Sequence, residues 1–200
     1  LDTTPYYDRM VNLIEAVEHN GTEGNRVNII ETHYVKNEDE ARAYFMKMVD
    51  EGKEGAVLKN RDLPWKDHTS PNQIKLKQIL DCDLKIVGWY PAERGSAFDG
   101  GIGGFNLESS CGKIKTNVGS GLTRDQRGLE PVDPEDITKG LQVTEGFDFD
   151  QYNGKIAATQ FNEVVTSKSK DTFSLFLGVL VEVREDKTEA DSCDYVRALK

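Results

Sequence analysis

The feature that most constrains the fold is a change, near residue 81, in the kind of secondary structure that the sequence predicts. Before this point, patterns typical of helices alternate with short strands; after it, the chain consists of strands separated by glycine turns. No internal repeat or low-complexity segment interrupts either part. The sequence therefore predicts an α+β chain of two pieces, residues 1–80 and residues 81–200.

The first piece is predicted to hold helices and strands in alternation. Apolar residues recur at helical spacing in Pro5–His19, and again after Asn37, a suitable helix N-cap. The β-branched residues of Val27–Tyr34 predict a strand between these helices. Two further short strands are expected at Gly55–Lys59 and Gln73–Lys77, separated by a polar loop.

The second piece is predicted to be a small barrel. A short helix is expected from Asp133, with proline at its first position, to Gly140. This helix falls between the third and fourth of five strands, which is the order of an OB-fold, although an all-β sandwich also fits five strands. The five predicted strands are Leu84–Tyr90, Phe105–Ser109, Lys113–Val118, Lys155–Val165 and Phe173–Val183.

Composition adds limits on compartment and partners. No apolar run approaches the ~20 residues of a membrane span, and three widely spaced cysteines predict free thiols in a reducing compartment. The 25 basic and 35 acidic side chains give a net charge of −10, which by itself argues against a nucleic-acid partner. The charges are polarised, however: Gly52–Lys77 holds six basic residues and three acids, whereas Glu130–Asp150 holds seven acids and one lysine.

The first candidate site lies on the two short strands. Lys75 and Lys77 point to one face of a strand, about 7 Å apart, and a phosphate between them would relieve their repulsion. Glu54 is the type of ligand that a hard divalent metal prefers. Lys59 is five positions after Glu54, so in a strand the two side chains point to opposite faces, and both line one pocket only if Gly55 twists the chain. The alternative is a solvated edge strand after an ordinary turn.

The second candidate site follows the last apolar strand. Arg184 and Lys187 flank acidic residues, including Asp186, in a pattern that can orient a polyphosphate or a nucleic-acid backbone. The alternative is a charged strand end whose side chains pair with one another.

The order of these sites resembles that of the ATP-dependent DNA ligases. Glu54–Lys59 resembles motif IV of that family, Lys75 and Lys77 motif V, and Arg184, Asp186 and Lys187 motif VI. Further stretches look like those of the T-even bacteriophage ligases, namely Cys82–Gly88, Cys111–Lys115, Gly119–Leu122 and Arg184–Thr188.

The resemblance implies a reaction in three steps. A lysine attacks the α-phosphate of ATP, AMP passes to the 5′-phosphate of a nick in duplex DNA, and the 3′-hydroxyl displaces AMP. Glu54 is then expected to hold Mg²⁺ or another divalent metal, and Lys59, Lys75 and Lys77 to contact the nucleotide. Arg184 and Lys187 are expected to orient the pyrophosphate, with Asp186 holding these two cations in place.

The resemblance also implies what is missing and where DNA binds. The K-x-D-G motif of the family's nucleophile does not occur in these 200 residues. We therefore expect the chain to be the C-terminal portion of a ligase, unreactive with ATP by itself, monomeric, and active in the cytoplasm of a bacterial host. Alternatives are an RNA ligase, a capping guanylyltransferase, or an OB module that binds nucleic acid without chemistry. The cations expected to face DNA are Arg94, Lys113, Lys115, Arg124, Arg127, Lys168 and Lys170.

Overall fold

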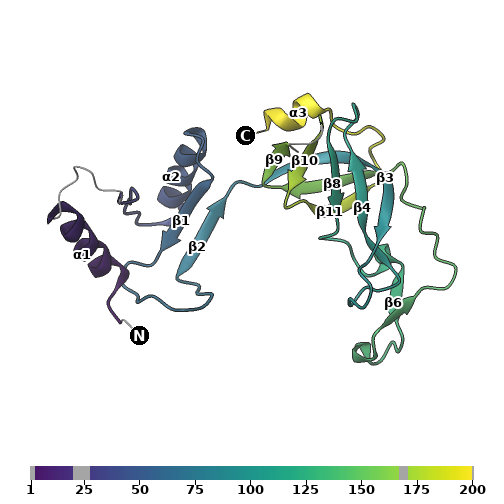
Figure 1. Ribbon diagram of the computed structural model, residues 1–200, viewed down its shortest axis with the longest axis horizontal. Helices are drawn as coiled ribbons and strands as arrows, with labels where there is room; N and C mark the ends of the chain where they lie inside the picture. The colour runs from purple at the N-terminus through teal and green to yellow at the C-terminus, as the bar shows by residue number, and fades with distance from the viewer. Residues whose placement is uncertain (1–2, 20–27, 167–170, 200) are drawn as a thin grey trace. The chain divides into compact units, whose positions relative to one another are not determined.

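The computed structural model of this chain describes residues 3–19, 28–166 and 171–199. It divides into two compact units, Leu1–Gln78 and Ile79–Lys200, each of which is considered by itself (Figure 1). No helix in the described part of the chain is long and apolar enough to cross a membrane.

The first unit contains two helices and a two-stranded antiparallel sheet. Helix α2 begins where predicted, because the side chain of Asn37 accepts a hydrogen bond of 2.9 Å from the backbone N–H of Glu40. The two strands pair with Gly55 opposite Lys77. This register places Glu54, the residue before Gly55, close to Lys77. The elements are α1 (Tyr6–His19), α2 (Glu38–Asp50), β1 (Gly55–Lys59) and β2 (Gln73–Lys77).

The strand predicted at Val27–Tyr34 is wrong for the residues that the structure describes. Residues 28–35 form neither helix nor strand, and Val27 lies outside the described residues. The side chain of Ile30 is 85% exposed. A β-branched composition favours a strand only where a partner strand and a packed face are available, and β1 pairs with β2 instead.

The second unit is a five-stranded barrel with the strand order β11-β8-β3-β4-β5, all neighbours antiparallel. An isolated parallel bridge from Ser120 to Val179 joins the β5 end of this sheet to β11 at its other end, and a second, from Ile114 to Phe173, joins the β5 end to β10. The elements are β3 (Leu80–Pro91), β4 (Ile102–Glu108), β5 (Lys115–Val118), β6 (Leu129–Pro131), β7 (Leu141–Val143), β8 (Ile156–Phe161), β9 (Glu163–Thr166), β10 (Phe173–Phe176), β11 (Val179–Arg184) and α3 (Cys193–Ala198).

The barrel encloses the core of the second unit. Alternate residues of β3 point inward, so that Cys82, Leu84 and Ile86 are almost completely buried. Phe105 of β4 and Phe161 of β8, the two strands on either side of β3, are buried in the same core. The inward-facing side chains of these strands therefore build the core.

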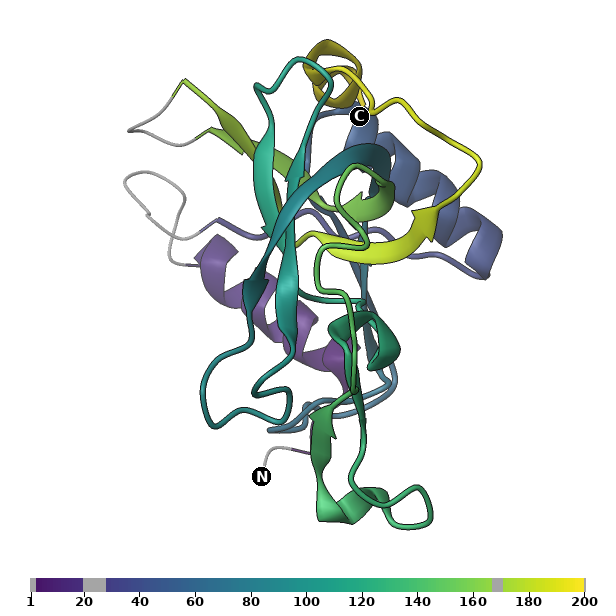
Figure 2. The same cartoon turned by 90° about the vertical axis from the view of Figure 1, so that its right-hand side faces the viewer.

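Two predictions for the second unit need correction. The last two predicted strands each divide in two, since β8 ends before Asn162 and β10 ends before Leu177, which has a positive φ of 56°. The region from Asp133 to Gly140 forms only a three-residue 3₁₀ turn, Ile137–Lys139, capped by Asp136. This turn lies at the tip of the β6–β7 hairpin, which extends away from the barrel (Figure 2), and none of the turn's residues is buried, so no packing stabilises a longer helix there.

Candidate functional site

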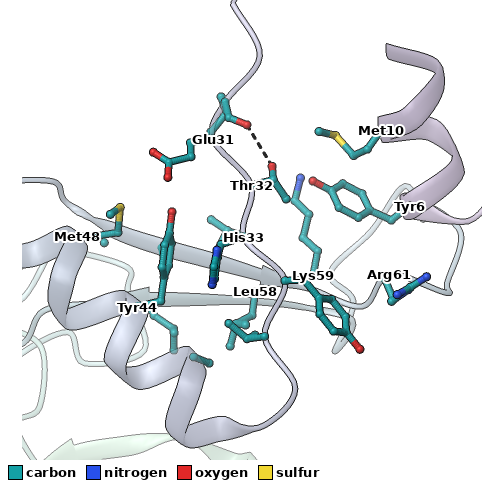
Figure 3. A pocket seen from close by; sticks show the side chains of 18 of the residues that line it. Tyr6, Met10, Glu31, Thr32, His33, Tyr44, Met48, Leu58, Lys59 and Arg61 are labelled. Carbon is teal, nitrogen blue, oxygen red and sulfur yellow. Dashed lines mark hydrogen bonds between the residues drawn. The ribbon is translucent and has the colours of Figure 1, made fainter. Parts of the chain in front are cut away.

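The first unit has a large open cavity of about 1470 Å³. It is lined by α1, α2, the irregular residues 28–35 and the β1–β2 pair (Figure 3). Both Glu54 and Lys59 line it, although they lie at opposite ends of β1. Gly55 has a φ of +150°, and a Cβ there would lie 2.1 Å from the carbonyl oxygen of Leu76. Only glycine fits this close approach, which lets the chain turn as it enters the strand.

The charged side chains of β1 and β2 converge on the same cavity. Lys75 lies opposite Val57 and Lys77 opposite Gly55, so both lysines are on one face of β2. Lys77 forms an ion pair with the exposed carboxylate of Glu54. The hydrogen bond from Lys77, with a weaker attraction from Lys75, lowers the pKa of the Glu54 carboxyl. The structure thus brings together Glu54, Lys75 and Lys77 as a charged cluster.

Aromatic side chains flank the other cations of this cavity. The ammonium group of Lys59 lies 4.7 Å from the centre of the Tyr6 ring. The guanidinium of Arg61 lies 4.6 Å from the ring centre of Tyr7 and 5.3 Å from that of Tyr34. Such contacts hold a cation over a π face, and Arg61 is also paired with Asp62 at 3.1 Å. These contacts could not be predicted from the sequence, because the tyrosines lie on α1 and in residues 28–35, distant in sequence from the cations that they contact.

One more aromatic pair lines the cavity. His33 and Tyr44 are stacked with ring centres 5.0 Å apart and planes 5° from parallel (Figure 3). From the sequence, His33 reads as an isolated residue without a role. Tyr44 lies on α2, eleven residues farther along the chain, so the residues beside His33 in the sequence do not indicate this contact.

The described residues do not build a complete metal site. No group of three or more His, Cys, Asp and Glu side chains in the described segments could hold a metal ion. Glu54 is a single carboxylate that is bonded to Lys77, and divalent metals take several oxygen ligands. No chemical step through a metal is therefore derived from this chain.

The second candidate site is a network of five charged residues on the barrel. Arg184 donates to both carboxylate oxygens of Asp186, at 3.0 and 2.6 Å. Arg184 and Lys187 also donate to one and the same oxygen of Asp83, Oδ2, at 2.8 and 2.7 Å. Lys187 donates at 2.9 Å to Asp191 as well. These bonds raise the pKa of Arg184, mainly through Asp186, and that of Lys187, mainly through Asp83.

The role expected for Asp186 is thus divided among three carboxylates. Asp186 contacts Arg184, whereas Lys187 is held by Asp83 and Asp191. Asp83 and Asp191 were not among the predicted residues. Asp83 lies about a hundred residues before Arg184 and Lys187, so its contacts with them cannot be predicted from sequence spacing. The sequence carries no distinctive signal for Asp83, because the same strand also holds Asp81 and Lys85.

The cations expected to face DNA fall into three groups. Arg94 and Lys113 are exposed, and Lys115 is exposed but paired with Glu108 at 2.8 Å. Arg124 is half-buried beside Asp125, at 3.5 Å. Lys168 and Lys170 lie outside the described residues.

The prediction for Arg127 is wrong. This side chain is only 6% exposed, and burial lowers the pKa of its guanidinium. It donates to the carbonyl oxygens of Ile102, Gly103 and Gly119 at 2.8, 3.0 and 2.6 Å. Arg127 therefore ties β4 to the end of β5, and its nitrogens do not face a ligand.

Sequence comparisons relate the chain to known enzymes. Residues 1–77 match the family model of the ATP dependent DNA ligase domain. The DNA ligases of Enterobacteria phages T4 and T6 are each 39% identical to this chain over 173 residues, which is 86% of the chain. A DNA ligase of African swine fever virus is 34% identical over 70 residues, 33% of this chain and 17% of its own length. The chain spans only 34% of the length of the phage relatives.

Comparison with solved structures gives the fold. A structure described as a Lig E DNA ligase has a TM-score of 0.66 over 92% of this chain and 60% of its own, at 15% identity. A second, described as Pmar-Lig, has a TM-score of 0.58 over 74% of this chain and 31% of its own, at 20% identity. The predicted mixed α+β class and the predicted five-stranded barrel of the second unit are confirmed by this likeness and by the observed sheet.

Proposed function

We propose that this chain, which is related to the T4-type ATP-dependent DNA ligases, is part of an enzyme that seals nicks in duplex DNA. The observation that carries this proposal is the 39% identity over 173 residues, since the match runs through both units. The absence of K-x-D-G from these residues supports a nucleophilic lysine elsewhere in the complete enzyme. We therefore propose that the chain is a C-terminal portion of that enzyme, with residues 1–80 in the nucleotidyltransferase domain and residues 81–200 in the OB domain.

The geometry of the cavity is suited to a nucleotide phosphate. Phosphoryl transfer depends on positioning and on neutralising charge that develops on phosphate oxygens. Lys75 and Lys77 share one face of β2, and Lys59 is held over Tyr6 beside them. In the proposed enzyme these three lysines contact ATP. The Lys77–Glu54 pair keeps one of these ammonium groups in place before the nucleotide arrives.

The barrel network is suited to the pyrophosphate leaving group. Arg184 and Lys187 are about 70% buried, so each retains an open side toward solvent. In the proposed enzyme these two cations orient pyrophosphate during the transfer of AMP to the enzyme. Asp186 holds Arg184 through two hydrogen bonds and contacts no substrate.

DNA is proposed to lie against the exposed cations of the barrel, Arg94, Lys113, Lys115 and Arg124. Contacts of this kind are to phosphates, so the affinity should fall steeply with salt and be insensitive to sequence. The acids of Glu130–Asp150 are placed away from DNA in this proposal. We further propose that the enzyme acts as a monomer in the cytoplasm of a bacterial host, where ATP, Mg²⁺ and DNA are present.

Nick sealing by the complete enzyme tests the proposal. The double substitution Lys75→Ala plus Lys77→Ala should reduce sealing of a nicked duplex ~10²-fold or more, because both phosphate contacts are lost. The control is Lys36→Ala plus Arg42→Ala, which removes two exposed cations from outside the charged cluster. An OB module without chemistry would show no sealing before substitution, and an RNA ligase would prefer nicked RNA.

The 200-residue chain tests the assignment of the nucleophile. Incubation with ATP labelled at the α-phosphate should give no covalent adenylate on this chain. A labelled lysine within these residues would contradict the proposed position of the nucleophile.

A further inference from the structure

Asp83 is the one carboxylate, among the described residues, that contacts both Arg184 and Lys187. We infer that Asp83 is a positioning residue that holds these two cations side by side for the leaving phosphate. The inference rests on the proposed function and deepens it, since it adds a residue outside the motifs that carry the resemblance.

The shared oxygen fixes the spacing of the two cations. Arg184 Nη1 and Lys187 Nζ both donate to Asp83 Oδ2, at 2.8 and 2.7 Å. The distance between the two nitrogens therefore cannot exceed the sum of these two hydrogen-bond distances. Two cations this close repel each other unless an anion lies between them. Asp83 supplies that anion, and the spacing suits two contacts to one phosphate group.

Sheet register explains how Asp83 reaches Arg184. Asp83 on β3 lies opposite Ala158 on β8, which in turn lies opposite Glu182 on β11. Arg184, two residues beyond Glu182, projects from the same face. The intervening side chain is that of alanine, so little bulk separates Asp83 from Arg184.

A second link locks Asp83 to the segment that follows the last strand. The backbone N–H of Asp83 donates at 2.8 Å to the carboxylate of Asp191, and the N–H of Asp191 donates at 2.7 Å to the carbonyl of Asp83. Asp191 also accepts from Lys187. The side chain of Asp83 is 12% exposed and that of Asp186 is 69% exposed. Asp83 is thus the buried, fixed member of the network, and Asp186 is its exposed member.

The test uses Asp83→Asn in the complete enzyme, with Asp81→Asn as the matched control. Asp81 lies on the same strand, is exposed, and loses the same charge on substitution. Removing the shared oxygen's charge should lower kcat of self-adenylylation about 10- to 100-fold, as expected for a displaced catalytic group. KM for ATP should change little, because the lysine contacts in the first unit remain. Joining of a nick that already carries AMP should also be retained, since no pyrophosphate leaves in that step.

Equal losses in Asp83→Asn and Asp81→Asn would overturn the inference, as would an equal loss in adenylylation and in joining of the adenylated nick. Should Asp83→Asn fail to fold, Asp191→Asn tests the same network: it should slow adenylylation selectively but by a smaller factor, because Asp191 contacts only Lys187 of the two cations.

A readout independent of activity separates this inference from the proposed function. In the 200-residue chain, the side-chain NMR signal of Lys187 Nζ should shift on Asp83→Asn and stay unchanged on Asp81→Asn. An enzyme without ligase activity would contradict the proposed function, while an unmoved Lys187 signal would overturn the positioning role of Asp83.

Discussion

Replacing Arg127 by methionine is expected to destabilise the barrel strongly. Its guanidinium donates to three backbone carbonyls and lies 4.2 Å from the ring centre of Phe98. Hydrogen bonds from a charged group contribute roughly 1.5–3 kcal/mol each. Methionine fills similar space but leaves these carbonyls without a donor. It also relieves the cost of burying a cation for which the described residues provide no carboxylate, so the net loss should be about 3 kcal/mol.

Thermal unfolding followed by the fluorescence of Trp89 measures this loss. The chain has two tryptophans, so a Trp65→Phe background leaves only Trp89, which packs on the core of the barrel. In a unit of this size, about 3 kcal/mol corresponds to a decrease in Tm of roughly 10 °C.

The control for this prediction is Arg94→Met, which makes the same chemical change at an exposed position. Its effect should be within ~0.5 kcal/mol of zero. Equal Tm values for Arg127→Met and Arg94→Met would refute the reasoning. A selective loss of DNA affinity with unchanged Tm would instead return Arg127 to the DNA-facing surface.

Two further predictions concern the closure of the barrel and the reactivity of its cysteines. Gly121→Ala should lower stability by ~3 kcal/mol or more in urea unfolding, because the new Cβ would lie 2.0 Å from the carbonyl oxygen of Leu180 at a φ of +88°. Gly146→Ala, with a φ of +72° but no atom within 4 Å, should cost only ~1 kcal/mol; similar losses in both would show that the contact with Leu180 does not matter. The pKa of the exposed Cys111 thiol is lowered to about 7, mainly by the Ser109 hydroxyl, so its alkylation by iodoacetamide should rise with pH through 7 and then level off. Buried Cys82, whose pKa is raised to about 12, should stay unmodified in peptide mass spectra, and a Cys111 midpoint near 9 would contradict the role of Ser109.

Local signals were enough to predict several elements of this chain. The cap at Asn37 and the apolar spacing after it determine α2, and the bounds of β1 and β2 match the predicted strands. These elements depend on neighbouring residues, which a sequence displays directly. The stretch Leu84–Tyr90 likewise predicted the central strand of the barrel, although this strand extends farther at both ends.

Features that depend on distant partners could not be predicted in the same way. Residues 28–35 have strand-forming side chains, but in the described structure they pair with no strand. The segment from Asp133 to Gly140 was predicted to be a helix, but it lies at a hairpin tip, where Lys139 forms an ion pair with Asp133. Arg127 looks like a surface cation until the carbonyls of β4 are placed around it. Asp83 gains its contacts only when β11 lies two strands away.

The closure of the barrel has a consequence for how the chain folds during synthesis. Asp83, on the central strand, and Arg184, on the last strand, are 101 residues apart. A ribosome adds ~5–20 residues per second, so roughly 5–20 s pass between the synthesis of Asp83 and that of Arg184. Until Ala158 of β8 is synthesised, 75 residues after Asp83, the pairing edge of β3 toward β8 has no partner, and such edges are sites of misassembly. Completion of the barrel and assembly of the Arg184–Lys187 pair are therefore one late event, because the strand that closes the sheet also carries Arg184.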